Sequence, residues 1–218
     1  TISSKTTLFA KWNPMDANLT VVFWYENAND DEYSFAGSAS VNAKTGAQVS
    51  SADYQNHNFT GPDETTGPDA KHFTYNSAKA ETVTVKGDGS SVLNVYYTRN
   101  EYTLTFKDGQ QTLTCTKTEH KHSKACCKYG GTGLGHLYHR DSCCKLGLSE
   151  HTHNDSCYES SDLIIAAKYQ ADIHSNFPIK SGEETIWWTV PYGCESFEYG
   201  HYLGSIDTMP GEDITFTK

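Results

Sequence analysis

The chain has 218 residues and a formal net charge of −10, from 17 Lys and Arg against 27 Asp and Glu. The charges form no basic block, which argues against a nucleic-acid partner. No apolar run approaches the roughly 20 residues that cross a bilayer, and the opening TISSKTTLFAKW lacks the pattern of a secretion signal. The 14 Tyr and the frequent Thr and Ser favour strands and turns. We therefore expect a mainly β or α+β protein with more than one domain, cut from a larger polypeptide.

The first predicted element is a strand within residues 1–14. In TTLFAKWNP, Leu8, Ala10 and Trp12 take every second position before Pro14 ends the run. Such alternation is typical of a strand with one buried face. We expect this segment to be the terminal strand of a preceding repeat.

A small domain is predicted over residues 15–100. NLTVVFWYENAN and EYSFAGSASVNAKTG have the composition of two strands, the second of which ends at Gly46. SSADYQN can begin a short helix with Ser50 or Ser51 as its N-cap. ETVTVKGDGSSVLNVYYTRN predicts two strands joined as a hairpin by a Gly-Asp-Gly turn. We expect these strands and the helix to form one domain that ends near Arg99.

A second β-rich domain is predicted over residues 101–218. EYTLTFKDG supplies its first strand, DLIIAAKYQADIHSNFPI resumes the domain, and ETIWWTVPYG and EDITFTK supply two further strands. Residues 115–157 separate the first two of these strands and contain few apolar side chains. We therefore expect this Cys/His-rich stretch to be an insertion in the second domain.

Several short motifs resemble known cell-surface modules. TTLFAKWNP and MPGEDITFTK resemble the endings of Listeria–Bacteroides type repeats and internalin-type B-repeats, which are strung along surface proteins of Gram-positive bacteria. The stretch that ends in VLNVYYTRN resembles the mucin-binding-protein modules that accompany them. The resemblance implies tandem β-grasp-like modules of a secreted adhesin on a bacterial cell surface. The Cys/His stretch and IWWTVPYGCESFEYGHYLGS depart from the usual repeat, so the resemblance does not carry a ligand over to this chain.

The Cys/His stretch has the composition of a metal site. It contains six of the seven cysteines and six of the ten histidines, in three successive sets of order Cys, His, His, Cys. The sets are Cys115, His120, His122 and Cys126; Cys127, His136, His139 and Cys143; and Cys144, His151, His153 and Cys157. Two thiolates and two neutral imidazoles are the ligands of a tetrahedral structural zinc site. We expect up to three structural Zn²⁺ ions, which replace a hydrophobic core in this stretch.

Other interpretations of these residues stay open. In a secreted protein the cysteines can form disulfides, which Cys194 can join, and a mixture of disulfides and metal sites is a third arrangement. Neighbouring sets can also exchange ligands, so the number of ligands is better defined than their grouping. A catalytic zinc needs an open position and a general base, for which Glu119 and Glu150 are the nearby candidates. Four protein ligands leave no place for a water, and we therefore expect no enzyme activity.

The sequence thus predicts a non-catalytic, monomeric binding module of an adhesin that recognises a host macromolecule. By analogy with related surface proteins, an immunoglobulin held in the superantigen manner or a mucin glycoprotein is the expected partner. Trp187 and Trp188 are the candidate partner-binding residues, because adjacent strand residues point to opposite faces and at most one can enter the core. A structural stalk that contains structural zinc is the alternative, and a zinc metalloenzyme is the least favoured.

Overall fold

A computed structural model describes residues 7, 9, 11, 13–123, 126–128, 141, 144–178, 180–181 and 184–218. Within these ranges the helices are 3-10 turns of three or four residues: η1 (Ser51–Tyr54), η2 (Pro62–Glu64), η3 (Ser77–Lys79), η6 (Asp155–Cys157) and η7 (His174–Asn176). No described helix has the length and apolarity needed to cross a membrane. Strands make up most of the regular structure, so the predicted mainly β class is confirmed.

Six strands form the first sheet, in the spatial order β5, β4, β2, β1, β8, β6. Their bounds are β1 (Asp16–Glu26), β2 (Tyr33–Lys44), β4 (Phe59–Thr60), β5 (Thr66–Gly67), β6 (Phe73–Tyr75) and β8 (Ser91–Arg99). β1 pairs antiparallel with β2 and parallel with β8. Its alternate side chains Leu19, Val21 and Phe23 are fully buried, because successive strand residues face opposite sides of a sheet. We call residues 16–99 the first module.

The short helix predicted after the second strand is present as η1. Ser50 is its N-cap: the Ser50 hydroxyl accepts the Ala52 N–H at 3.3 Å. In return, the Asp53 carboxylate accepts the Ser50 N–H at 3.1 Å. This reciprocal capping satisfies backbone donors that the helix itself leaves unpaired, which confirms the N-cap predicted from the sequence.

The predicted hairpin around the Gly-Asp-Gly turn is wrong. β7 (Thr82–Thr84) pairs with β3 (Gln48–Ser50) in a separate two-stranded sheet, whereas β8 lies between β1 and β6. β8 buries Leu93 and Val95 completely in the first core. Burial of this apolar face beside β1 outweighs the local pairing that the turn would have allowed.

The described residues before Asp16 form no strand. Phe9 is almost fully exposed there. Leu8, Ala10 and Trp12, on which the prediction of a strand within residues 1–14 depends, lie outside the described residues.

Residues 101–218, the second module, contain a three-stranded sheet in the order β10, β9, β15. Its strands are β9 (Glu101–Leu113), β10 (Tyr158–Lys168) and β15 (Ile214–Phe216), and two small pairs join β11 (Lys180–Ser181) to β12 (Glu184–Thr185) and β13 (Trp188–Thr189) to β14 (Tyr202–Leu203). Phe106 lies at the centre of the core, where its ring centroid is 4.9 Å from Trp188 and 5.1 Å from Phe216. All four strand regions predicted for this part of the chain contain strands.

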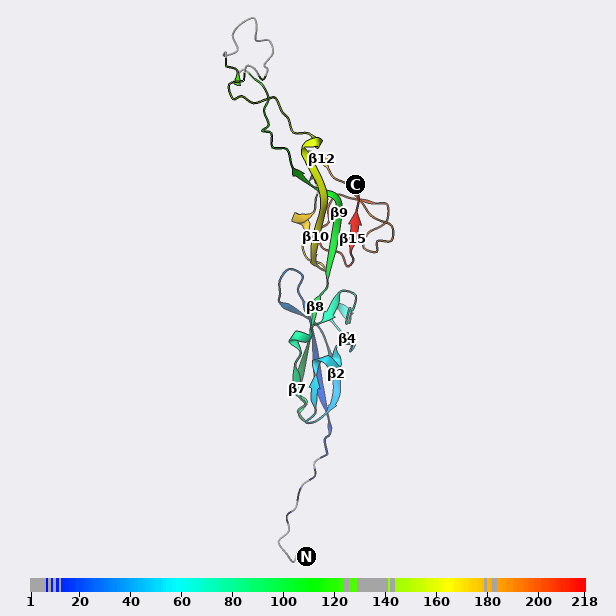
Figure 1. Ribbon diagram of the computed structural model, residues 1–218. Coiled ribbons are helices and arrows are strands. Elements are labelled where there is room, and N and C mark those ends of the chain that lie inside the picture. Colours follow the sequence, from blue (N-terminus) through cyan, green and yellow to red (C-terminus); the bar gives the residue numbers. More distant parts are fainter. Residues whose placement is uncertain are drawn as a thin grey trace, which may run out of the picture.

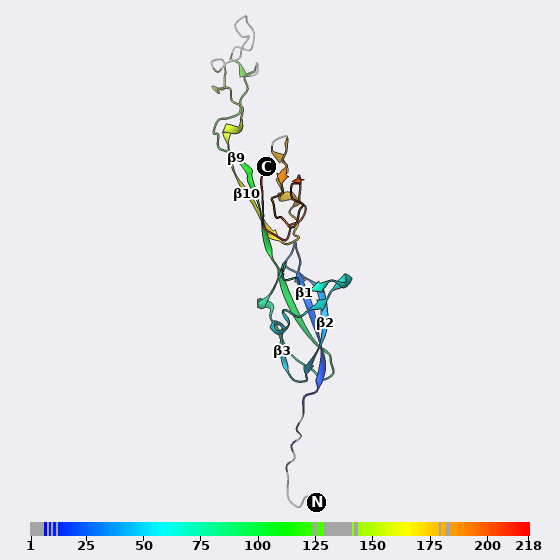
Figure 2. The same cartoon turned by 90° about the vertical axis from the view of Figure 1, so that its right-hand side faces the viewer.

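The two modules lie end to end, and only Asn100 separates β8 from β9 (Figures 1 and 2). Glu26, which is 8% exposed, lies at the junction. Its carboxylate accepts the Arg99 N–H at 2.8 Å and a hydrogen bond from Lys168 Nζ at 2.9 Å. A buried carboxylate is tolerated when a cation and a hydrogen-bond donor satisfy it, so this set of contacts joins the modules.

Candidate metal centres

The described residues within 114–157, which we call the arm, extend from the end of the second module that is remote from the first (Figure 1). The arm has an outgoing segment, which continues β9 from Thr114, and a returning segment, which leads to β10 through Cys157, and the two segments run antiparallel. The N–H groups of Thr114 and Cys115 donate to the Cys157 carbonyl at 2.9 and 3.2 Å. Further along, His120 and His151 exchange two backbone hydrogen bonds of 2.9 Å. This pairing places potential metal ligands of the outgoing segment opposite those of the returning segment.

The inner cluster lies next to the second module and consists of Cys115, His151, His153 and Cys157. One ligand atom from each residue lies within 4.8 Å of the ligand atoms of the other three. The Sγ atoms of Cys115 and Cys157 are 3.3 and 3.7 Å from His151 Nε2. The cluster therefore offers two sulfurs and two imidazole nitrogens to one point in space.

The outer cluster consists of His120, His122, Cys126 and Cys144, with the same limit of 4.8 Å between ligand atoms. Cys144 Sγ lies 3.3 Å from His120 Nε2, and Cys126 Sγ lies 3.8 Å from His122 Nδ1. The Lys145 N–H donates to the Cys126 carbonyl at 2.7 Å, which keeps the two segments of the arm together at the cluster. Both cysteines are buried.

The geometry of both clusters fits a tetrahedral metal ion. With metal–sulfur bonds of about 2.3 Å and metal–nitrogen bonds of about 2.1 Å, a tetrahedron places sulfur and nitrogen ligands about 3.6 Å apart. The sulfur–nitrogen distances in the clusters are 3.3 to 3.8 Å. Each of these sulfur–nitrogen distances, taken alone, is also compatible with a hydrogen bond. However, His153 Nδ1 is buried and has no hydrogen-bond partner. A metal ion in the inner cluster would satisfy this nitrogen.

Hydrogen bonds prepare the outer cluster for a cation. The Ser123 N–H and then His122 lower the pKa of Cys126 to about 6. Asp141, and next Cys126, raise the pKa of His122 to about 9. Asp141 Oδ1 lies 2.7 Å from His122 Nε2, so His122 Nδ1 faces the cluster. A carboxylate on the far nitrogen of a ligand histidine orients the ring and increases its basicity, and a bound metal would displace the remaining proton.

The acidic residues beside the clusters contact backbone groups. Glu119 Oε1 accepts the His153 N–H at 3.1 Å, and Asp141 Oδ1 accepts the Glu150 N–H at 3.2 Å. The first contact links the two antiparallel segments of the arm, and the second lies within the returning segment. With four protein ligands in each described cluster, the arrangement suits a structural ion better than a catalytic one, which keeps an open coordination position.

The grouping of ligands in chain order is wrong in one respect. The structure exchanges Cys115 and Cys144 between the first and third predicted sets. The exchange follows from the antiparallel pairing, because the first ligand of the arm meets the last ones across the pair. Sequence spacing alone does not show this pairing, although it left open an exchange of ligands between neighbouring sets.

The middle predicted set is only partly described. Cys127 is buried and forms a β-bridge with Cys144, whereas His136, His139 and Cys143 lie outside the described residues. A third ion therefore stays a prediction. No disulfide joins the cysteines that the structure describes.

The two adjacent tryptophans have opposite environments. Trp188 is fully buried, and its indole N–H donates to the Pro178 carbonyl at 2.9 Å. The prediction that Trp188 binds a partner is therefore wrong, because no surface of its side chain is accessible. Trp187 is 57% exposed and remains a candidate. The alternation of faces was predictable, but which face is buried depends on the surrounding core.

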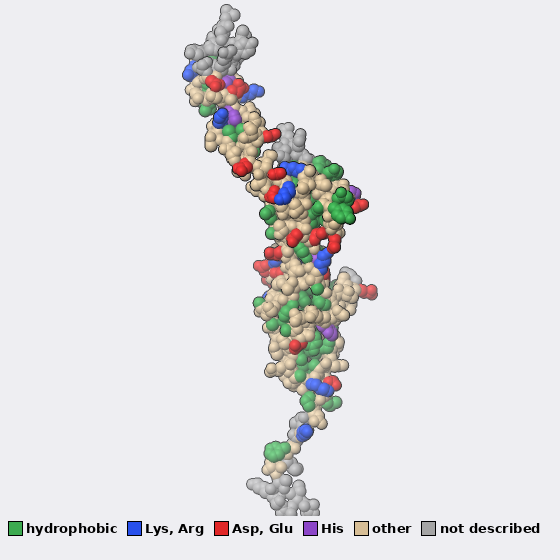
Figure 3. All heavy atoms as spheres, turned by 45° about the vertical axis from the view of Figure 1, so that its right-hand side comes forward, with side chains coloured by type: hydrophobic (Ala, Val, Ile, Leu, Met, Phe, Trp, Pro, Cys, Tyr) green, Lys and Arg blue, Asp and Glu red, His purple; other side chains and the backbone are tan. Residues whose placement is uncertain are grey.

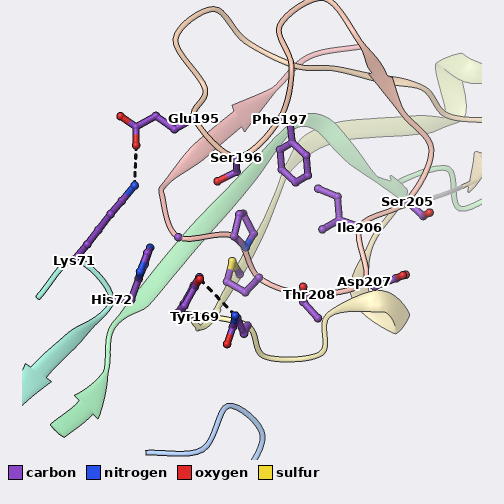
Figure 4. A pocket seen from close by; sticks show the side chains of 14 residues that line it. Lys71, His72, Tyr169, Glu195, Ser196, Phe197, Ser205, Ile206, Asp207 and Thr208 are labelled. Carbon is purple, nitrogen blue, oxygen red and sulfur yellow. Dashed lines mark hydrogen bonds and ion pairs between the residues drawn. The ribbon is translucent and has the colours of Figure 1, made fainter. Parts of the chain in front are cut away.

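A polar cavity of about 670 Å³ lies at the junction of the two modules (Figure 4). At its edge, Lys71 of the first module forms an ion pair of 2.7 Å with Glu195 of the second. The His72 ring stacks on Tyr169 with 3.9 Å between centroids, and Asp69 binds the His72 ring nitrogen at 2.7 Å. In the sequence His72 is an isolated histidine, and no local pattern indicates its contact across the junction. These contacts stabilise the end-to-end arrangement.

The sequence matches no protein-family model, and comparisons with curated proteins and with solved structures found no match.

Proposed function

We propose that this chain is a non-catalytic binding module of a bacterial cell-surface adhesin whose arm is held together by structural zinc. The observation that carries the proposal is the pair of four-ligand Cys/His clusters between the two antiparallel segments of the arm. Two thiolates and two imidazoles match structural zinc. Zinc bound there would supply a rigid link between the two segments of the arm, with no open coordination position for chemistry.

The composition of the arm supports a structural role for the metal. Among its described residues, the buried apolar side chains are all cysteines: Cys126, Cys127, Cys144 and Cys157. Such a segment has little hydrophobic burial to offset the entropy lost on ordering, roughly 1 to 2 kcal/mol per residue. Structural zinc contributes on the order of 10 kcal/mol in isolated zinc modules. Metal binding can therefore replace the missing core.

The elongated arrangement supports a role in binding at a cell surface. The modules lie end to end and the arm extends beyond them (Figures 1 and 2). The motif resemblance to repeats of Gram-positive surface proteins supports secretion and a host partner. An immunoglobulin held in the superantigen manner and a mucin glycoprotein are the two partners that we propose to test first.

Capture from host material tests the proposal. The chain is purified without chelator, immobilised, and incubated separately with serum and with mucus, and retained proteins are identified by mass spectrometry. We expect retention of a dominant immunoglobulin or mucin, and zinc that stays bound through dialysis. Capture of nothing from either source contradicts a binding function and favours the structural stalk. Substrate turnover that changes when the metal is exchanged contradicts a non-catalytic role.

A double variant tests whether the arm takes part in capture. Cys115→Ser with Cys126→Ser removes one ligand from each described cluster and changes neither hydrophobic core. If the arm contributes to the binding surface, affinity for the captured protein should fall at least tenfold, about 1.4 kcal/mol. Thermal melts of the variant should retain the transition of the first module. Unchanged affinity would place the binding surface outside the arm.

A further inference from the structure

The two cysteines of each described cluster come from opposite segments of the arm. In the inner cluster, Cys115 lies on the outgoing segment and Cys157 on the returning segment, and their sulfurs lie within 4.8 Å of each other. In the outer cluster, Cys126 and Cys144 have the same relation and the same limit. Each pair of sulfurs therefore spans the arm at a point where its two segments meet.

The backbone brings each pair of cysteines within reach of a disulfide. The Cys115 N–H donates to the Cys157 carbonyl at 3.2 Å. With standard bond lengths, this hydrogen bond keeps the two Cα atoms at most about 7 Å apart, close to the range of about 4.4 to 6.8 Å found for disulfides. Cys126 is next to Cys127, which forms an antiparallel β-bridge with Cys144. Covalent joining of either pair thus needs rotation of side chains and little movement of the backbone.

Access to the sulfurs differs between the two clusters. Cys115 is partly exposed, whereas the other three cluster cysteines are buried. In Figure 3 the described part of the arm stands away from the body of the second module, and histidine side chains are visible on its surface. A small reagent in solution therefore reaches the inner cluster first, through Cys115, because thiol exchange needs direct access to a sulfur atom.

We propose that the two described clusters are sites of thiol–disulfide exchange, at which a low-molecular-weight disulfide replaces the metal link across the arm by a covalent one. One cluster thiolate attacks the small disulfide, forms a mixed disulfide and releases one small thiolate. The second cluster thiolate then attacks the cysteine sulfur of the mixed disulfide, which forms the cystine and releases the second small thiolate. Two electrons pass from the cluster to the small disulfide. A bound Zn²⁺ leaves for the solvent, because the thiolate and not the cystine is the metal ligand.

The pairing across the arm gives the exchange its consequence. A disulfide within each cluster joins the outgoing segment to the returning segment at the place where a metal ion would join them. Disulfides between neighbours in chain order would run from Cys115 to Cys126 and from Cys144 to Cys157. Such links close loops inside one segment and leave the two segments unjoined. The inference rests on the proposed function, since it describes how the metal sites of that function respond to oxidation.

Exposure of the full chain to oxidised glutathione tests the exchange. The chain is purified without chelator, released zinc is followed with a chromophoric chelator, and disulfides are mapped by mass spectrometry without reduction. We expect the Cys115–Cys157 disulfide first and the Cys126–Cys144 disulfide later, with one Zn²⁺ released for each. Cys194 is the internal control: it belongs to neither cluster and should be absent from both disulfides.

Two variants separate the pairing of the sulfurs from the binding of metal. Cys127→Ser with Cys143→Ser removes the cysteines next in sequence to the outer pair, so that the outer disulfide is assigned without ambiguity. His151→Ala removes a nitrogen ligand of the inner cluster and keeps both of its sulfurs. It should lose one Zn²⁺ and still form the inner disulfide, because the backbone and not the metal holds the two cysteines together. Chain-order disulfides in either variant, or no inner disulfide in His151→Ala, overturn the proposal.

Limited proteolysis shows whether the oxidised arm stays closed. Trypsin cuts after Lys117 and Lys121 on the outgoing segment and after Lys145 on the returning segment. Chelator should raise the rate of cleavage at these sites at least tenfold in the reduced chain and leave it unchanged in the oxidised chain, and equal acceleration in both overturns the proposal. If the purified chain holds zinc but forms chain-order disulfides, the exchange is refuted and the proposed function stands. If the chain holds no zinc but forms both disulfides across the arm, the structural-zinc role fails and the exchange stands.

Discussion

The antiparallel arrangement of the arm predicts that its two described metal clusters are thermodynamically coupled. The longest loop between two ligands of the inner cluster runs from Cys115 to His151, about 36 residues. When the outer cluster is closed, it joins His120 to Cys144 and leaves a loop of only about 12 residues for the inner cluster to close. Since the cost of closure grows with the logarithm of loop length, the saving is about 1 kcal/mol, or about fivefold in metal affinity.

The perturbation is Cys126→Ser, which removes one ligand of the outer cluster. We expect zinc affinity at the inner cluster, measured by competition with a chromophoric chelator, to fall about fivefold. Cys194→Ser is the matched control, because Cys194 lies in the second module, where its Sγ contacts Glu212 Oε1 at 3.5 Å. The control should change neither the number of ions nor their affinity. An inner-cluster affinity that does not respond to Cys126→Ser would refute the loop-closure argument.

Double variants distinguish this arrangement from ligand sets in chain order. Cys115→Ser with Cys157→Ser affects a single cluster and should remove one ion, whereas Cys115→Ser with Cys126→Ser affects both and should remove two. Ligand sets in chain order predict the reverse: the Cys115, Cys157 variant would lose two ions and the Cys115, Cys126 variant one. Elemental analysis after dialysis counts the ions, and the reversed result would show that the pairing across the arm is incorrect.

Trp188→Ala should lower the free energy of unfolding of the second module by about 3 to 5 kcal/mol, because a fully buried indole is removed. Urea denaturation measures the loss, and a value below about 1 kcal/mol would contradict the buried position. Gly37→Ala should destabilise the first module by about 1 to 3 kcal/mol, because the added methyl group would overlap the Phe59 ring, and an unchanged thermal melt would disprove this contact. Lys168→Ala should destabilise the junction by about 1 to 3 kcal/mol, because the buried Glu26 carboxylate loses a partner. Glu26 raises the Lys168 pKa above its ordinary 10.5, so denaturation of wild type and variant should differ below that pH and converge as the pH rises through the raised pKa.

Local patterns in the sequence were sufficient for several features. Strand-forming composition and alternation predicted the long strands β1, β2, β8, β9 and β10, and a serine at position 50 or 51 predicted the start of a short helix, because these signals depend on neighbouring residues alone. The candidate metal ligands were equally visible, since Cys and His at short spacings are the usual ligand types of structural zinc sites.

The tertiary structure alone decided which of these elements meet. β8 pairs with β1 instead of β7, and Cys115 meets His151 instead of His120, because such pairings depend on burial and backbone hydrogen bonds between distant segments. Alternation likewise assigned Trp187 and Trp188 to opposite faces without showing which face is buried. That outcome depends on Phe106 and the rest of the core around the indole. Local sequence thus specified the strands and the ligand types, while the free energy of long-range packing selected their partners.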